Sequence, residues 1–309
     1  MTSNRSTELD GGSAAAPKSP RPNLGTLVAV AWVGLVLAAG LFAFAMSGPG
    51  PTPLLTTGTF TTSGTTMTLN GDCTTDATIM IPDGFALDGA GYTITAIDPA
   101  GGHFLGAVVK NVGSTAHVRD LRITTSGLKD TCDGGDARLR GILFDGASGS
   151  IRDNTVTNIN QGASGCQEGN GIEVRDAPFD DTHPDTEYVT IADNTVTGYQ
   201  KTGIVGNGDV FVTITGNTVV GLGPVPYIAQ NGIQIGFNGT GEVEDNDISG
   251  NHYSKCSNRD AAQTGCVPWV SAGLLLYDVD ANSVKHSQNH FRDNQRNLLL
   301  ITSASLGNP

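Results

Sequence analysis

Hydrophobic and polar residues alternate in short runs along most of this chain, and one such run recurs. Each copy begins with glycine, followed by an aliphatic residue, any residue, and usually a second apolar residue. Alternation with a period of two predicts short β-strands, and no copy contains the pattern of an amphipathic helix. The copies begin at Gly106, Gly141, Gly171, Gly203, Gly232 and Gly273, with a later one at Asn297.

A second unit follows most of these copies and has an asparagine at its fourth position. Strands this short cannot bury a face alone, so each copy must stack on the next one. Stacked about 4.8 Å apart, equivalent asparagines predict an internal ladder that bonds the backbone of a turn. The asparagines concerned are Asn154, Asn194, Asn217, Asn246 and Asn289.

Together the two units resemble the parallel β-helix repeats of the pectate-lyase-like superfamily over residues 62–303, and residues 81–94 resemble an opening coil of such proteins. The resemblance implies an all-β fold, a right-handed, single-stranded parallel β-helix (a solenoid) of about seven to nine coils. That superfamily includes polysaccharide lyases, glycoside hydrolases, uronan epimerases, phage tailspikes and members with no known reaction. The fold therefore does not choose a function by itself.

An apolar run without a charge, residues 24–46, precedes the repeats. Its 23 residues would reach roughly 34 Å as a helix, which predicts a transmembrane signal anchor. Lys18 and Arg21 precede it, so the positive-inside rule exports the repeats. A small-residue motif at residues 43–45 keeps a cleaved signal peptide open as the alternative.

Four regions follow from this division: a disordered cytoplasmic tail (1–23), the anchor (24–46), a linker (47–61) and the β-helix domain (62–309). The expected location is the cell membrane, single-pass with an extracytoplasmic C-terminal domain. Cleavage of the anchor would make the protein secreted.

Charge and cysteine content add two constraints. The chain has a formal net charge of −13, which argues against a nucleic-acid partner and requires a local basic patch for any polyanionic substrate. Five cysteines in an exported domain predict disulfides, with free thiols as the alternative. The expected bridges lie within one loop and between neighbouring coils, and they leave Cys73 unpaired; they are Cys256–Cys266 and Cys132–Cys166.

Strand alternation points the first and third residues after each glycine inward and the second and fourth outward. The outward positions predict a polar strip of Asp145, Glu173, Arg175, Asn207 and Gln234, with Tyr277 beyond it. Inserted loops gather around the same face, since three of them precede a first strand and one follows it. They are residues 126–140, 161–170, 251–271 and 177–187. In β-helix proteins of known activity such loops wall a groove for a polymer chain.

Glu173, Arg175 and Asp145 are the candidate catalytic residues. Asp145 and Glu173, with Cα atoms about 8 Å apart, suit the acid and base of an inverting glycosidase. Alternatively, Arg175 or Lys201 removes a proton next to a uronate carboxyl, as lyases and epimerases of this fold do. A third interpretation is an ion pair between Asp145 and Arg175. The candidate substrate-binding residues are Asn207, Gln234, Lys201, His183, Asp180, Asp181 and Tyr277.

No cofactor is predicted, although Asp130, Asp133 and Asp136 could gather a calcium ion without matching an EF-hand loop. The polygalacturonase motifs and a pectate-lyase-like acidic calcium cluster are absent from the sequence. The predicted function is therefore extracytoplasmic recognition of a polysaccharide, with lyase, hydrolase or epimerase activity in a groove. The alternatives are a non-catalytic surface module that binds glycan or protein, and an assembly protein that stacks end to end; the oligomeric state stays open.

Overall fold

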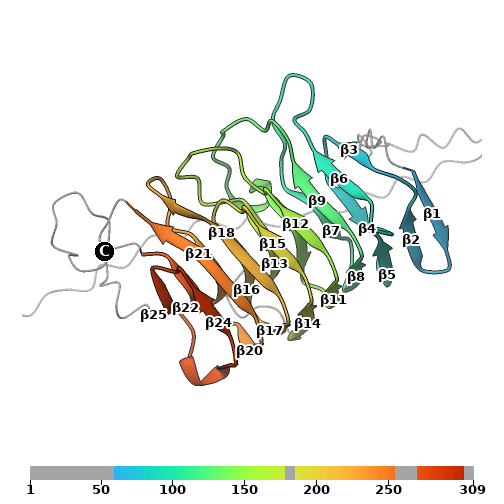
Figure 1. The fold of residues 1–309 in the computed structure, drawn as a ribbon. Coiled ribbons are helices and arrows are strands. Elements are labelled where there is room, and N and C mark those ends of the chain that lie inside the picture. Colours follow the sequence, from blue (N-terminus) through green and yellow to red (C-terminus); the bar gives the residue numbers. More distant parts are fainter. Residues whose placement is uncertain (1–58, 178–184, 255–269, 303–309) are drawn as a thin grey trace, which may run out of the picture. The chain divides into compact units, whose positions relative to one another are not determined.

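The computed structural model describes residues 59–177, 185–254 and 270–302, and these residues form stacked coils (Figure 1). Each coil contributes one strand to each of three sheets, in the chain order first, second, third sheet. Within the described residues, seven consecutive strand triplets, from β4–β6 to β22–β24, make complete coils. The predicted parallel β-helix is confirmed.

Every sheet is built by strands from successive coils. The first sheet contains β4 (Ile79–Ile81), β7 (Ala107–Asn111), β10 (Arg140–Asp145), β13 (Asn170–Asp176), β16 (Thr202–Gly208), β19 (Asn231–Gly236), β22 (Ala272–Tyr277) and β25 (Arg296–Ile301). The second contains β1 (Phe60–Ser63), β2 (Thr66–Leu69), β5 (Phe85–Asp88), β8 (Thr115–Arg119), β11 (Ser148–Arg152), β14 (Glu187–Ala192), β17 (Val210–Thr215), β20 (Thr240–Glu244) and β23 (Val284–Ser287). The third contains β3 (Cys73–Thr75), β6 (Thr93–Ala96), β9 (Arg122–Thr125), β12 (Thr155–Thr157), β15 (Thr195–Thr197), β18 (Thr218–Val225), β21 (Asp247–Tyr253) and β24 (His290–Arg292).

Among the strands that the structure describes, all pairs are parallel except β1 with β2, which closes the N-terminal end of the second sheet as an antiparallel hairpin. Two short 3₁₀-helices, η1 (Gly135–Ala137) and η2 (Ala281–Ser283), lie in connections between sheets. Among the described residues, no helix is long and apolar enough to cross a membrane. The predicted anchor, residues 24–46, lies outside the described part of the chain.

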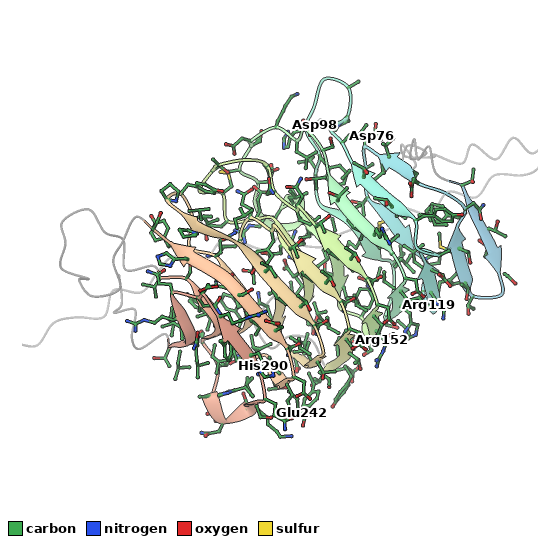
Figure 2. All side chains as sticks on the ribbon, in the orientation of Figure 1. Asp76, Asp98, Arg119, Arg152, Glu242 and His290 are labelled. Carbon is green, nitrogen blue, oxygen red and sulfur yellow. A yellow bond between two sulfur atoms is a disulfide. The ribbon has the colours of Figure 1, made fainter. Side chains whose placement is uncertain are left out.

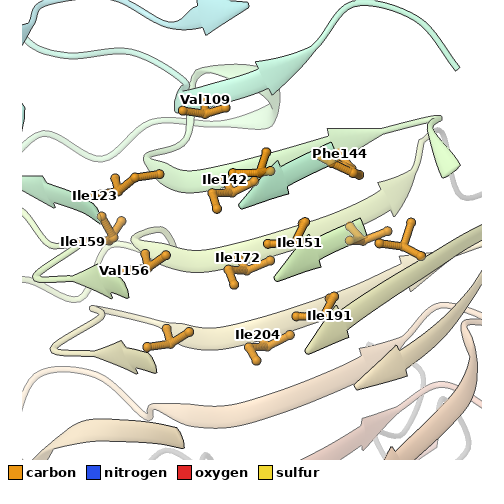
Figure 3. Close-up of a cluster of buried hydrophobic side chains, with 14 of the residues drawn as sticks. Val109, Ile123, Ile142, Phe144, Ile151, Val156, Ile159, Ile172, Ile191 and Ile204 are labelled. Atoms are coloured by element: carbon orange, nitrogen blue, oxygen red, sulfur yellow. The ribbon is translucent and has the colours of Figure 1, made fainter. Parts of the chain in front are cut away.

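The core consists of side chains stacked in columns. Ile142, Ile172 and Ile204 occupy equivalent positions on β10, β13 and β16, and all are fully buried (Figure 3). The third residue after each glycine, such as Phe144 and Val174, is buried as well. These columns confirm the predicted inward positions, and each such side chain contributes about 1.5–3 kcal/mol through burial.

The repeated glycine is required by close packing between the first sheet and the third. A Cβ at Gly171 would lie 2.4 Å from Val196 Cγ1, and one at Gly203 would lie 2.4 Å from Val219 Cγ1. Any larger residue would separate the two sheets within a coil. This geometry explains why glycine recurs near the start of five first-sheet strands, β10, β13, β16, β19 and β22.

Gly106 does not belong to this series, so the predicted alignment of the earliest copy was wrong. Val109, not Ala107, pairs with Ile142, which shifts the copy by two residues. Gly106 has φ +83° and occupies a turn before β7. Glycine is favoured at position 106 by the left-handed backbone conformation, not by close packing between sheets.

The predicted asparagine ladder is confirmed at the turn between the second and third sheets. Asn154 Nδ2 donates to Asn194 Oδ1 at 2.9 Å, and Asn194 Nδ2 donates to Asn217 Oδ1 at 3.0 Å. The same pattern continues through Asn246 to Asn289, with both contacts at 2.9 Å. Each rung also bonds backbone of the neighbouring coil, so the turn's buried polar groups are satisfied.

Candidate functional site

The outward face of the first sheet brings together the polar residues expected there. Glu173 pairs in register with Val205, and Arg175 pairs with both Asp145 and Asn207. Gln234 continues the first of these columns, and Tyr277 lies farther along the second, after Gly236. The predicted strip therefore exists as one continuous surface across β10, β13, β16, β19 and β22.

A further outward column, formed by the residue before each repeated glycine, was not predicted. Arg140 belongs to it, is only 2% exposed, and donates from Nε to Glu173 Oε2 at 2.6 Å. Asn170, which lies on β13 together with Glu173, donates from Nδ2 to the same Glu173 oxygen at 2.7 Å. Glu173 itself is 4% exposed, and the two hydrogen-bond donors offset the cost of burying its charged carboxylate. The sequence does contain a signal for this column, because a polar residue precedes successive repeated glycines. After Arg140 and Asn170 these residues are Thr202 and Asn231.

Asp145 and Arg175 form a second ionic group on this face. Arg175 contacts Asp145 in a bidentate manner, at 3.0 Å from Nε and 2.9 Å from Nη2, and also pairs with Asp136. Lys110 Nζ lies 3.0 Å from Asp145 Oδ2. Burial opposes ionisation of Asp145, but the hydrogen bonds from Arg175 and Lys110 outweigh it and hold its pKa below the usual value. The ion-pair interpretation of Asp145 and Arg175 is confirmed.

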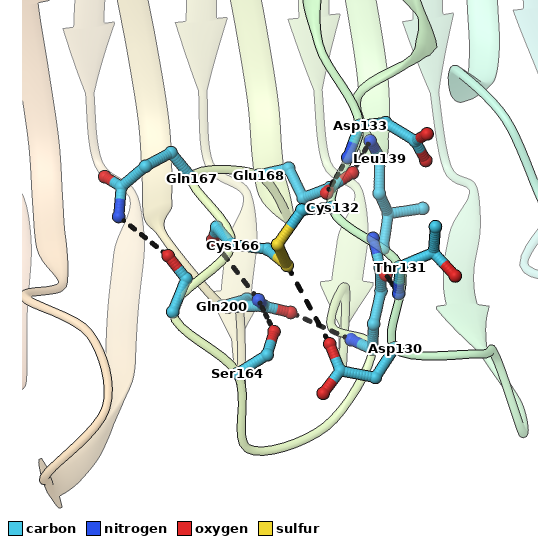
Figure 4. Close-up of a disulfide and its surroundings, with 12 residues drawn as sticks. Asp130, Thr131, Cys132, Asp133, Leu139, Ser164, Cys166, Gln167, Glu168 and Gln200 are labelled. Carbon is cyan, nitrogen blue, oxygen red and sulfur yellow. Dashed lines mark hydrogen bonds between the residues drawn. A yellow bond between two sulfur atoms is a disulfide. The ribbon is translucent and has the colours of Figure 1, made fainter.

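Two inserted loops wall one side of this face and are joined to each other. Cys132, in the loop between β9 and β10, forms a disulfide with Cys166, in the loop between β12 and β13, with a Cα–Cα distance of 5.0 Å (Figure 4). The Glu168 carboxylate accepts the backbone N–H groups of Asp133 and Leu139, both at 2.8 Å. The loops are therefore held together both covalently and by buried hydrogen bonds.

Amide side chains extend this connection to the following coil. Thr131 N donates to Gln161 Oε1 at 2.8 Å, and Gln161 N donates to Gln200 Oε1 at 2.9 Å. Gln200 Nε2 reaches back to Ser164 Oγ at 2.8 Å (Figure 4). Three successive connections thus form a single ordered wall.

The wall and the sheet enclose a groove with a volume of about 360 Å³. Its charged lining consists of four cations and one carboxylate, although the whole chain carries a net charge of −13. Charged side chains elsewhere, such as Arg119, Arg152 and Glu242, project from the second sheet (Figure 2). The groove residues are Gly135, Arg138, Arg140, Gln167, Asn170, Glu173, Arg175, Lys201, Thr202, Val205, Asn207, Gln234 and Phe237.

Two of the four cations are neutralised within the site, and two are not. Arg140 and Arg175 are paired with carboxylates, as described above. Arg138 and Lys201 form no ion pair with any residue of the described ranges. The groove therefore has uncompensated positive charge contributed by one wall loop and by the connection before β16.

Lys201 has the most unusual environment of these cations. Its Nζ donates to the backbone oxygen of Ala229 at 2.8 Å, a neutral partner. Burial lowers its pKa to about 8. About a tenth of such a lysine is neutral at pH 7 and able to accept a proton. The pKa of Arg175, in contrast, is raised by Asp145 and Asp136 despite its burial, so it stays charged.

The acidic residues considered for calcium do not converge. Asp133 lies 3.0 Å from His103 Nε2, Asp136 pairs with Arg175, and Asp130 Oδ1 contacts the disulfide sulfur of Cys166 at 3.8 Å. In the part of the chain that the structure describes, no group of three or more His, Cys, Asp or Glu residues is placed to hold a metal ion.

Several predicted residues lie outside the described ranges, namely Asp180, Asp181 and His183, together with the predicted bridge Cys256–Cys266. Cys73 is a buried free thiol, consistent with its being left unpaired. Burial and, to a smaller extent, Asp72 raise the pKa of Cys73. Of the predicted binding residues, Asn207, Gln234 and Lys201 line the groove.

One of three comparisons with known proteins, the family model, agrees with this architecture. A family model described as "Right handed beta helix region" matches residues 140–309. No curated protein matches the sequence. Among solved structures, the crystal structure of the Dettilon tailspike protein (gp208) matches with 15% identity and a TM-score of 0.29, over 75% of this chain and 53% of the tailspike. This chain thus spans about half the length of that protein.

Proposed function

Since the chain belongs to the right-handed β-helix family, we propose that the groove on its first sheet binds an acidic polysaccharide. The observation that carries this proposal is the presence of two unpaired cations, Arg138 and Lys201, in a groove of a strongly acidic protein. A polyanion is repelled by most of the surface and attracted to this groove. The charge pattern therefore supports an acidic ligand at this position.

The remaining lining suits a sugar chain. Gln167, Asn170, Asn207 and Gln234 provide amide donors and acceptors for hydroxyl groups. The face from β10 to β22 crosses four strand spacings, about 19 Å, which leaves room for several consecutive sugars. The walls are tied by a disulfide and hydrogen bonds, so the polymer meets a largely preformed site.

The proposal includes an extracytoplasmic location, with residues 24–46 as an anchor or as a removable signal. The Cys132–Cys166 disulfide supports an oxidising compartment. The acidic body supports a glycan rather than a nucleic acid as the partner.

Elimination of an acidic glycan is the catalytic activity that the groove supports best. Neutral Lys201 would remove the proton on the carbon next to the uronate carboxylate. The bond from the neighbouring carbon to the glycosidic oxygen breaks, a carbon–carbon double bond forms, and the departing oxygen takes a proton from water. The pKa of Lys201, about 8, favours this role. An epimerase would use the same proton abstraction.

Hydrolysis through Asp145 and Glu173 has less support. A general acid needs a raised pKa, whereas Arg175 and Lys110 lower that of Asp145. Glu173 is held by Arg140 and Asn170. Both carboxylates are therefore better suited to fixing the arginines of the face than to acid–base chemistry.

The test measures binding and product with the full chain. Uronans, sulfated glycans and neutral glycans are offered to wild type, Arg138→Gln, Lys201→Met and the matched control Lys285→Met, which removes an exposed lysine of β23. Acidic glycans should bind wild type and the control, and bind both groove variants at least tenfold more weakly. Equal binding of neutral glycans, or no effect of either groove variant, would overturn the proposal. Absorbance of unsaturated uronates from wild type but not from Lys201→Met identifies a lyase, and recovery of the bound glycan without cleavage or epimerisation identifies a binding module.

A further inference from the structure

The groove continues into a smaller hollow at its C-terminal side. This hollow has a volume of about 200 Å³, below the roughly 300–1,000 Å³ of pockets that hold a separate ligand. Lys201, Gln167, Gln234 and Phe237 line both spaces, so the hollow extends the groove. A polymer lying in the groove would place its next unit there.

The character of the face changes between the two spaces. Along one outward column Glu173, Val205 and Gln234 are followed by Leu275 and Leu299, so the last two positions are both apolar. Among the described lining residues of the hollow, Lys201 alone carries a charge. Its apolar lining consists of Ala229, Phe237, Val270, Leu275, Tyr277 and Ile301.

Phe237 stands at the junction and is held in an unusual conformation. Its φ is +52°, in the left-handed region where a turn normally places glycine or asparagine. Phe237 N donates to Tyr277 O at 3.0 Å, and the two rings lie 5.2 Å apart at an interplanar angle of 54°. A bulky residue in such backbone is a strained feature of the kind that gathers at binding sites. This backbone conformation places the aromatic ring of Phe237 where the polar groove meets the hollow.

We propose that the hollow is a subsite for a sugar carrying a small aliphatic substituent, a methyl or an acetyl group, next to the acidic sugar held by Arg138 and Lys201. This inference rests on the proposed function and specifies its substrate class. Phe237 and Tyr277 offer ring faces to the C–H groups of the sugar. Leu275 and Ile301 pack against the substituent. A bare hydroxyl in its place would be buried against these apolar side chains without a hydrogen-bond partner.

Binding of matched acidic oligosaccharides to the full chain tests the subsite. Three forms of equal length are compared by calorimetry: unsubstituted, O-acetylated, and with 6-deoxy sugars at alternate positions. Burial of one methyl corresponds to about fourfold in affinity, so at least one substituted form should bind about fourfold or more tightly than the unsubstituted form. The two substituted forms distinguish the acetyl from the methyl.

Variants separate the subsite from the rest of the groove. Phe237→Gly removes the ring and relieves the positive φ, so it should fold at least as well as wild type while losing the preference. Leu275 lines the hollow but not the groove, so Leu275→Asn should lose the preference too and keep the affinity for the unsubstituted form. Tyr188→Ala removes an exposed aromatic of β14 and should behave as wild type.

Two results overturn the inference. Equal affinity of wild type for all three forms, or an unchanged preference in Phe237→Gly and Leu275→Asn, contradicts the subsite alone. If no acidic oligosaccharide binds wild type, the proposed function fails and the subsite with it.

Discussion

Replacing Lys201 with methionine is expected to stabilise the protein at neutral pH, although the change removes a hydrogen bond to Ala229. Burial lowers the pKa of Lys201 from 10.5 to about 8, so the native state holds the ammonium at a cost absent from the unfolded chain. A tenfold change in proton affinity equals about 1.4 kcal/mol, which sets an upper limit of about 3 kcal/mol. Water in the open groove reduces this, and we expect a gain of about 1–2 kcal/mol at pH 7.

The direction of the pH dependence follows from the lowered pKa of Lys201. Below pH 8 the lysine is protonated in both states, and the full penalty applies to wild type. Between pH 8 and 10.5 the unfolded chain binds more protons than the native state, so the stability of wild type rises with pH through this window. The advantage of Lys201→Met should therefore shrink as the pH approaches 10.5.

Urea unfolding followed by circular dichroism at a series of pH values from 7 to 10 measures both effects. Lys285→Met is the matched control, because Lys285 is an exposed lysine, and it should give no gain at pH 7. A Lys201→Met variant no more stable than wild type at pH 7 would mean that the buried ammonium carries no net cost. A stability difference between the two proteins that is the same at pH 10 as at pH 7 would contradict the lowered pKa of Lys201.

Three further changes test the scaffold under the groove. Asn217→Ala leaves the N–H and amide donors of Asn194 without their acceptor and should lower the free energy of unfolding by about 3 kcal/mol in urea titrations; the exposed Asn282→Ala should cost less than about 0.5 kcal/mol, and equal costs would contradict a structural ladder. Reduction of the Cys132–Cys166 bridge, which spans 34 residues, should lower the unfolding free energy by about 3–4 kcal/mol and weaken binding of acidic glycan in calorimetry, whereas unchanged binding would show that the hydrogen bonds alone hold the wall. Gly203→Ala forces a Cβ against Val219 and Gly232 O, so it should cost on the order of 3 kcal/mol and lower the thermal midpoint by roughly 6–12 °C, and a smaller shift would mean that the sheets can separate.

The sequence predicted the stacked columns well because two periodicities agree in them. Alternation defines which residues of a strand point inward, and the repeated glycine fixes the register between coils, so positions such as Ile172 and Glu173 could be assigned. The asparagine ladder was predictable for the same reason, since Asn194 and Asn217 recur at one position of a stacked turn. The predicted alignment of the earliest copy was wrong because glycine is favoured both by close packing and by a left-handed backbone conformation. Gly106 is an example of the second case.

Other parts of the site depend on contacts that no local pattern encodes. The repeated glycine packs against the third sheet, and the residue before it, such as Arg140, lines the groove together with Glu173. Simple alternation therefore missed Arg140 as the partner of Glu173. The wall depends on how separate inserted loops meet in the folded chain, and the lowered pKa of Lys201 results from its burial in the folded chain. Phe237 was missed because propensity disfavours an aromatic residue at positive φ.

The asparagine ladder has a consequence for the ligand. Its rungs run from the coil of β10–β12 to the coil of β22–β24, and these coils carry the groove, while Leu121 occupies the equivalent position one coil earlier. Linked hydrogen bonds polarise one another and open together, so these coils should form one cooperative unit in hydrogen exchange, with the coils before β10 opening more readily. A glycan would then meet a surface that is already rigid. Little conformational entropy is lost when the protein binds it, and the affinity depends mainly on how well the sugar fits.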